Sequence, residues 1–279
     1  MESGRRRGLL ATASVMAALI LSGCGGDAEP DENATADEPE QSAPADGPEL
    51  ASLDPAELLQ LSDEALRGAE SYTSSARSEV DGARGTFMDL MFVGAERCDA
   101  SVATVNGNVG VIREADDLWV QLDRMSLEAV FDEATVELLA NHHLHGPLDD
   151  PGLAEYAAMC ERGGLPEPVL DGQPAEDGYE TTLLTVEDGG EHHGTPVVAV
   201  RREESGGTGE GPASVTTTLL IAAEGEPYPL LLTGEMEFDF GTMVNTTEYS
   251  RFGDELPFRV PPETATVDVS ELGDALPPR

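Results

Sequence analysis

The sequence predicts an α+β fold: a strongly curved antiparallel sheet, an incomplete β-barrel of about ten strands, with two or three helices on its concave side. Most of the chain after residue 70 alternates apolar and polar residues with a period of two, which is typical of strands with one buried face. Helical spacing occurs in only a few segments. Many half-buried strands with few helices to cover them favour a sheet that curves around its own core.

The N-terminal segment has the pattern of a secretory signal. Arg5 to Arg7 precede an apolar run over residues 9–21, which is shorter than the roughly 20 residues that span a bilayer. The run ends in Leu21-Ser22-Gly23-Cys24, which resembles the lipobox of bacterial lipoproteins. We therefore predict a signal peptide over residues 1–23, lipidation at Cys24 and a lipid-anchored location on the extracytoplasmic face of the cell membrane. A single uncleaved membrane helix is the alternative.

Residues 24–50 are predicted to be a disordered tether. After Cys24 this stretch is acidic and rich in Pro and Ala, and it contains no basic residue. The whole chain carries a formal net charge of −40 and no Lys. Such a field repels nucleic acid and anionic membrane surfaces, so no nucleic-acid partner is predicted. The lipid anchor is the only predicted contact with the membrane.

Residues 51–279 are predicted to form one domain. Their number fits a single large β-rich domain, and 39% hydrophobic residues support a buried core. An aromatic content of 5% argues against stacking platforms for bases or sugars. Cys98 and Cys160 remain as an even pair in a secreted domain, which predicts a disulfide. A metal-bound pair or a reactive thiol lacks neighbouring ligands or an activating base in the sequence.

The strongest start signal for a helix lies at Asp54, which is followed by Pro55 and Glu57. Apolar residues at helical spacing predict helices over residues 54–69, 125–140 and 150–160. Alternation predicts strands over residues 72–80, 86–93, 98–105, 109–114, 118–122, 179–186, 195–202, 214–223, 228–240 and 242–252.

The strand over residues 228–240 carries the clearest pattern, with apolar residues on one face and polar residues on the other. Its apolar side chains, together with those of the first strand, are the predicted lining of an apolar ligand cavity. These candidates are Tyr72, Ala76, Val80, Tyr228, Leu230, Leu232, Met236, Phe238 and Phe240.

Several motifs follow one another in an order known from one family. They are the lipobox at Cys24, then Cys98, Leu118-Trp119-Val120, Cys160, Tyr228-Pro229-Leu230, Tyr249-Ser250-Arg251-Phe252-Gly253 and Val260-Pro261-Pro262. This order resembles actinobacterial lipoproteins of the LppX/LprG type, which are similar in fold to the periplasmic carriers LolA and LolB. The resemblance implies a half-barrel around a hydrophobic cavity for acyl chains, and no catalytic residues. The acidic insertion over residues 201–212 departs from it.

Histidines are the remaining candidates for chemistry. His142, His143 and His145 are close in sequence before Gly146-Pro147, and His192 and His193 form a second group. His side chains also suit helix ends, where they interact with the last carbonyls. We assign these histidines to helix ends and loops and predict no metal and no cofactor; a zinc or copper site that includes His142 and His145 is the alternative.

The sequence contains no Gly-x-Ser-x-Gly, His-Glu-x-x-His or Walker A motif, and no enzyme is predicted. Two functions remain. The domain carries or binds a lipid or another lipophilic molecule, or it is a surface interaction or sensor module with a filled core and a protein partner. The sequence does not identify that partner, and the volume of the cavity distinguishes the two functions.

Overall fold

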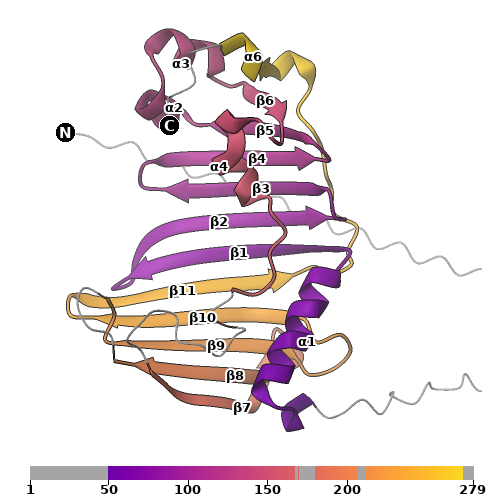
Figure 1. Cartoon of the computed structure of the whole chain (residues 1–279), viewed down its shortest axis with the longest axis vertical. Coiled ribbons are helices and arrows are strands. Elements are labelled where there is room, and N and C mark those ends of the chain that lie inside the picture. The colour runs from indigo at the N-terminus through magenta and orange to yellow at the C-terminus, as the bar shows by residue number, and fades with distance from the viewer. Residues whose placement is uncertain (1–49, 167–168, 170–179, 207–210, 273–279) are drawn as a thin grey trace, which may run out of the picture. The chain divides into compact units, whose positions relative to one another are not determined.

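Twelve strands form one sheet in the computed structural model, which describes residues 50–166, 169, 180–206 and 211–272 (Figure 1). These residues belong to one compact unit, Asp46–Arg279. The strands are β1 (Ser71–Val80), β2 (Ala83–Val93), β3 (Arg97–Thr104), β4 (Gly107–Glu114), β5 (Asp117–Leu122), β6 (His143–Pro147), β7 (Glu180–His192), β8 (Thr195–Ser205), β9 (Ser214–Ala222), β10 (Pro229–Phe238), β11 (Gly241–Ser250) and β12 (Thr266–Asp268). The predicted signal peptide, Cys24 and most of the predicted tether lie outside the described residues.

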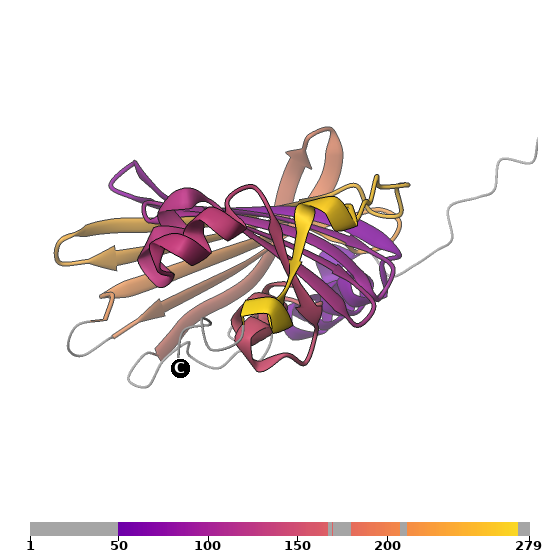
Figure 2. The same ribbon diagram turned by 90° about the horizontal axis from the view of Figure 1, so that it is seen from above.

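The order of the strands is β12-β6-β5-β4-β3-β2-β1-β11-β10-β9-β8-β7. Neighbours pair antiparallel except β6 and β12, which pair parallel. The pairing of β1 with β11 joins the early strands to the late ones. The sheet curves strongly without closing, as Figure 2 shows from above. The predicted fold class is therefore confirmed, and the strands added to the predicted ten are β6 and β12.

The helices are α1 (Pro55–Gly68), α2 (Arg124–Val130), α3 (Glu133–Leu139), α4 (Ala154–Met159) and α6 (Val269–Leu272), with short 3-10 turns η1 (Leu50–Ser52), η2 (Pro151–Leu153) and η3 (Glu263–Ala265). α1 begins where the sequence predicts it: the Asp54 carboxylate accepts a hydrogen bond from the backbone N–H of Ala56 at 2.9 Å. Its buried face, which includes Leu58 and Leu66, packs against β7 and β10.

α1 and α4 lie on the same side of the sheet (Figure 1). No described helix is both long and apolar enough to cross a membrane.

The predicted single helix over residues 125–140 is wrong, because two helices occupy this stretch. α2 ends at Val130, and Asp132 begins α3 by accepting a hydrogen bond from the backbone N–H of Thr135 at 2.9 Å. An Asp side chain competes for nearby backbone N–H groups and therefore favours a helix start over a helix interior. The continuous apolar spacing concealed this restart.

The assignment of the histidines to helix ends and loops is wrong for His143 and His145, whereas His142 lies in the loop just after α3 and contacts the carbonyl of its C-cap residue, Ala140. Residues 143–147 form β6, which pairs with β5 on one side and β12 on the other. β12 lies more than a hundred residues away in the sequence, so local spacing carries no signal for this pairing. Long-range hydrogen bonds here override the local pattern.

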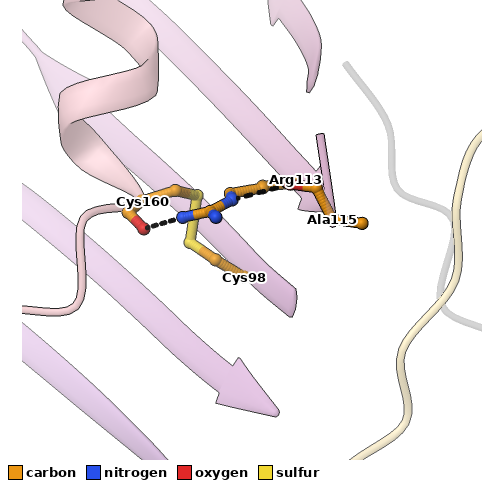
Figure 3. Close-up of a disulfide and its surroundings, with 4 residues drawn as sticks. All are labelled: Cys98, Arg113, Ala115 and Cys160. Atoms are coloured by element: carbon orange, nitrogen blue, oxygen red, sulfur yellow. Dashed lines mark hydrogen bonds between the residues drawn. A yellow bond between two sulfur atoms is a disulfide. The ribbon is translucent and has the colours of Figure 1, made fainter. Parts of the chain in front are cut away.

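The disulfide between Cys98 and Cys160 joins β3 to the end of α4 (Figure 3). The Cα atoms are 5.6 Å apart, and both residues are fully buried. The Arg113 side chain donates one hydrogen bond to the Cys160 carbonyl at 3.4 Å and another to the Ala115 carbonyl at 3.1 Å. The disulfide that the cysteine count predicts therefore holds the helical cover on the strands.

Candidate functional site

The register of the strands defines one continuous row of side chains across the concave face of the sheet. Residues directly opposite one another in neighbouring strands point to the same face. Leu232 of β10 is opposite Thr247 of β11 and Leu219 of β9. Extended to the neighbouring strands, the row contains Ala76, Thr247, Leu232, Leu219, Val200 and Val186.

A second row runs parallel to the first, four residues further along β10. Met236 is opposite Met243 on one side and Val215 on the other, and Met243 is opposite Val80. Beyond Val215 the row reaches Glu204, which forms a buried ion pair with Arg202 on the same face of β8. The second row is therefore apolar over four strands and ends at a buried charge pair, where partners compensate for the loss of water.

Burial falls from the first row to the second on β9 and β1, and it is intermediate in both rows on β10 and β11. Val200 and Leu219 are only 3% and 1% exposed and belong to the main core. Met236, Met243 and Val215 are half-buried, and Val80 is 37% exposed. The concave face is therefore fully buried at Val200 and Leu219 on β8 and β9, and it becomes more exposed toward Val80 and the turn between β10 and β11.

Aromatic rings cover the concave face at the end where β1 and β10 begin. The centroid of the Tyr72 ring lies 5.1 Å from that of Phe92 and 5.9 Å from that of Phe252. The Phe252 ring in turn stacks on the Tyr228 ring, with 4.1 Å between their centroids. The Arg162 guanidinium lies over Tyr72, 5.5 Å from the ring centroid, and donates to the Gly94 carbonyl at 3.2 Å. These contacts seal one end of the concave face.

Burial makes ionisation of the phenols in this region still less favourable than it is in water. It raises the pKa of Tyr249 to about 12, with a smaller contribution from Tyr72. The pKa of Tyr72 is raised by burial as well, although the Arg162 charge opposes the change. Neutral phenols keep the base of the concave face apolar at physiological pH.

The structure places the nine cavity candidates at different depths. Tyr72 belongs to the core, and Tyr228 and Leu232 pack against it. Ala76, Val80, Met236 and Phe238 follow the same face by alternation along β1 and β10. Leu230 lies in the register shift between Pro229 and Leu231, where this alternation is interrupted. Phe240 lies past the end of β10, is 73% exposed and stacks on Phe238 at 4.9 Å.

Sequence reasoning missed the residues that complete both rows on the neighbouring strands. They are Val186, Val200, Val215, Leu219 and Met243. Alternation placed each of them in or near a predicted strand, but alternation alone does not state which strands are neighbours. That information comes from long-range pairing.

Two pockets lie away from the nine cavity candidates. One, of about 680 Å³, is lined by residues of β3 to β5 together with Leu127 of α2. The other, of about 550 Å³, is lined by β1, β2 and β3 near Arg84 and Val105. None of the nine cavity candidates lines either pocket.

The histidines near residue 143 make separate contacts. His142 bonds through Nδ1 with the Ala140 carbonyl at 3.2 Å. His145 lies 3.1 Å from an Asp117 carboxylate oxygen and 3.6 Å from one of Asp268, and it stacks on Trp119. Burial lowers the pKa of His143. The described residues do not bring His142, His143 and His145 together as one metal ligand set.

The fold and the concave face define an incomplete barrel that presents apolar side chains on its inner side. No protein-family model matches the chain, and no curated protein matches it in sequence. Solved structures do match. LppX from Mycobacterium tuberculosis is 14% identical with a TM-score of 0.41, over 74% of this chain and 98% of LppX.

LprF from Mycobacterium bovis is 12% identical with a TM-score of 0.41, over 74% of this chain and 96% of LprF. A LolA-superfamily protein from Nitrosomonas europaea is 13% identical with a TM-score of 0.28, over 74% of this chain and 96% of that protein. The chain is thus similar to proteins of the kind that the sequence resembles.

Proposed function

We propose that this protein is a membrane-anchored extracytoplasmic lipoprotein that binds or carries a lipophilic molecule on the open part of its concave face. The N-terminal lipid is placed at Cys24, and the ligand lies along the second row, over Val80, Met236 and Met243. The proposal assigns a binding role and no catalytic residue.

One observation carries the proposal: the apolar face continues past the closed core into a half-buried row. Val80, Met243, Met236 and Val215 extend the apolar face beyond Leu219 and Leu232, and all four are less buried than Leu219. Apolar surface exposed to water costs roughly 25 cal/mol for each Å². An acyl chain laid along this row removes that surface from water and gains contacts with flexible methionine side chains.

The test is binding of a fluorescent fatty acid to the mature, tag-free chain. Met236→Trp places a large ring on the half-buried row and is expected to reduce binding at least about tenfold, which corresponds to roughly 1.4 kcal/mol. Glu235→Trp is the matched control, because the neighbouring residue of β10 points to the opposite face and is exposed. It is expected to bind like the parent.

Leu232→Trp tests the deeper part of the same face. It is expected to abolish binding of the probe while circular dichroism still shows a folded sheet. Lipid extracted from protein made in its native host and analysed by mass spectrometry identifies the natural ligand. If the parent binds no acyl probe, carries no extractable lipid and unfolds on Leu232→Trp, the concave face is solid core and the protein is an interaction or sensor module.

The anchor is tested separately. Cys24→Ala removes the lipidated residue and is expected to release the chain from the membrane fraction or to block its processing. Fractionation of cells followed by immunoblotting measures the distribution. A Cys24→Ala chain that stays membrane-bound like the parent contradicts the anchor and leaves the ligand-binding proposal intact.

A further inference from the structure

The tip of the β7–β8 hairpin carries two histidines next to a glutamate of a distant strand. β11 is separated from β7 by β8, β9 and β10 in the sheet, yet the His193 Nε2 atom lies 3.0 Å from a carboxylate oxygen of Glu248. Figure 2 shows the end of this hairpin bent away from the sheet, on the side opposite α4. A register shift lies between Asp188 and Gly190, a few residues before the tip, and such shifts bend and twist a strand.

The turn geometry brings the two imidazoles together. Along a strand, successive side chains point to opposite faces. Here His192 ends β7, and His193 and Gly194 form a two-residue turn with φ angles of 50° and 83°. The reversal places the centroids of the two imidazole rings 4.2 Å apart, with an angle of 60° between the ring planes. Adjacent residues thus present their ring nitrogens to the same point.

Together these residues form a compact set of donors. One ligand atom each from His192, His193 and Glu248 lies within 4.8 Å of the other two. Two ligands at 2.0–2.1 Å from a tetrahedral zinc ion are themselves about 3.4 Å apart, so small side-chain rotations suffice to bind one ion. Among the described residues, this is the one set of three His, Cys, Asp or Glu side chains that comes together in this way.

An unpaired ring nitrogen of His192 is the second observation that points to a bound ion. This Nε2 atom is buried and makes no hydrogen bond within the described structure. A buried ring nitrogen without a partner is unfavourable, and coordination or a bound water removes that cost. A hydrogen bond between His193 and Glu248 alone explains two of the three side chains and leaves His192 unexplained.

We propose that His192, His193 and Glu248 bind a divalent transition metal ion of the zinc class. Two imidazole nitrogens and one carboxylate oxygen are typical ligands of zinc sites that keep a fourth position for water. His193 is largely exposed, which leaves room for that water and for entry of the ion. The ion fastens the hairpin tip to β11 on the convex face, so the site is independent of the lipophilic ligand proposed for the concave face.

The test is a zinc titration of the mature, tag-free chain against a chromophoric chelator. Excess Mg²⁺ is present, because a chain of formal net charge −40 collects divalent cations nonspecifically on its carboxylates. The expected result is one zinc ion per chain and a rise in the temperature of unfolding on binding.

His193→Asn removes the imidazole but keeps a residue that tolerates the left-handed turn, and Glu248→Gln removes the charge at constant shape. Each is expected to weaken zinc binding at least about tenfold, the scale on which even indirect partners act. The matched control is His142→Gln with His145→Gln, which removes as many imidazoles elsewhere and is expected to bind zinc like the parent. The proposal is overturned if the parent binds no zinc in Mg²⁺, or if His193→Asn and Glu248→Gln bind it as the parent does.

Discussion

At the scale of single residues, the Asp123 carboxylate connects a helix start to a strand. It accepts hydrogen bonds from the backbone N–H of Ser126 at 2.8 Å and from the backbone and side-chain N–H groups of Asn108 at 2.9 and 3.0 Å. These bonds, the Ser126 backbone bond first, lower the pKa of Asp123. The pKa of Asp123 is therefore lower in the folded chain than in the unfolded chain. The resulting stabilisation is complete when the pH is above the pKa of the unfolded chain, and it is lost as the pH falls through the pKa of the folded chain.

We therefore expect Asp123→Ala to lower the free energy of unfolding by about 1 kcal/mol at pH 7, as for other helix caps. The difference between parent and variant is expected to shrink as the pH falls below the pKa of Asp in an unfolded chain. Urea denaturation at several pH values measures it. Asp123→Asn retains a capping side chain and serves as the control, expected to lie close to the parent at pH 7.

Asp99 on β3 has the opposite property. Burial raises its pKa, so its carboxylate is less favourable in the folded chain than in the unfolded chain at neutral pH. The cost is present above the raised folded pKa and disappears as the pH falls below the unfolded value. We expect Asp99→Asn to raise the unfolding temperature at pH 7 and to lose this advantage in acid. An Asp99→Asn chain that is less stable at neutral pH contradicts this reasoning.

At the scale of elements, β6 depends on close packing by its neighbours. A side chain added at Gly146 would place its Cβ 2.8 Å from a Val269 methyl group of α6 and 2.9 Å from one of Leu153. Gly146→Ala is therefore expected to lower the free energy of unfolding by about 1–3 kcal/mol, the usual cost of overpacking.

The matched control is Gly110→Ala in β4. The nearest atom to an added Cβ there is 3.9 Å away, so the strand has room for a methyl group. We expect its stability to equal or exceed that of the parent, because Ala restricts the unfolded chain more than Gly. Thermal unfolding of both variants, followed by circular dichroism, decides whether α6 packs on β6 as the structure shows.

Elements with local signals were predictable, and elements that depend on distant partners were not. The Asp54 cap and Pro55 set the start of α1, and alternation located most strands. β6 was mistaken for a helix end because its hydrogen-bond partner β12 is remote in sequence. The same reason applies to the candidate sites. Alternation along β10 predicted which of its side chains share a face, whereas the contact between His193 and Glu248 depends on the bend of the β7–β8 hairpin, for which the sequence has no local signal.

At the scale of the whole described domain, the disulfide closes a loop of 62 residues that includes β4 to β6 and α2 to α4. We expect Cys98→Ala with Cys160→Ala to lower the free energy of unfolding by about 4 kcal/mol, because the unfolded chain gains freedom. Ala avoids placing a hydroxyl group at two buried positions.

Guanidinium denaturation with and without a reducing agent measures this effect. Reduction is expected to destabilise the parent and to leave the double variant unchanged. A parent that is insensitive to reduction, with two free thiols by mass analysis, contradicts the bridge.

The described sheet ends at β7, a strand of 13 residues that pairs with β8 alone among the described strands. A long, straight edge offers its free backbone groups to strands of other copies and promotes aggregation. Two register shifts, at Thr181/Leu183 and Asp188/Gly190, divide this edge into shorter stretches. Molecules crowded together at high concentration therefore meet an edge along which a foreign strand cannot pair continuously, and this helps an open barrel to stay dispersed.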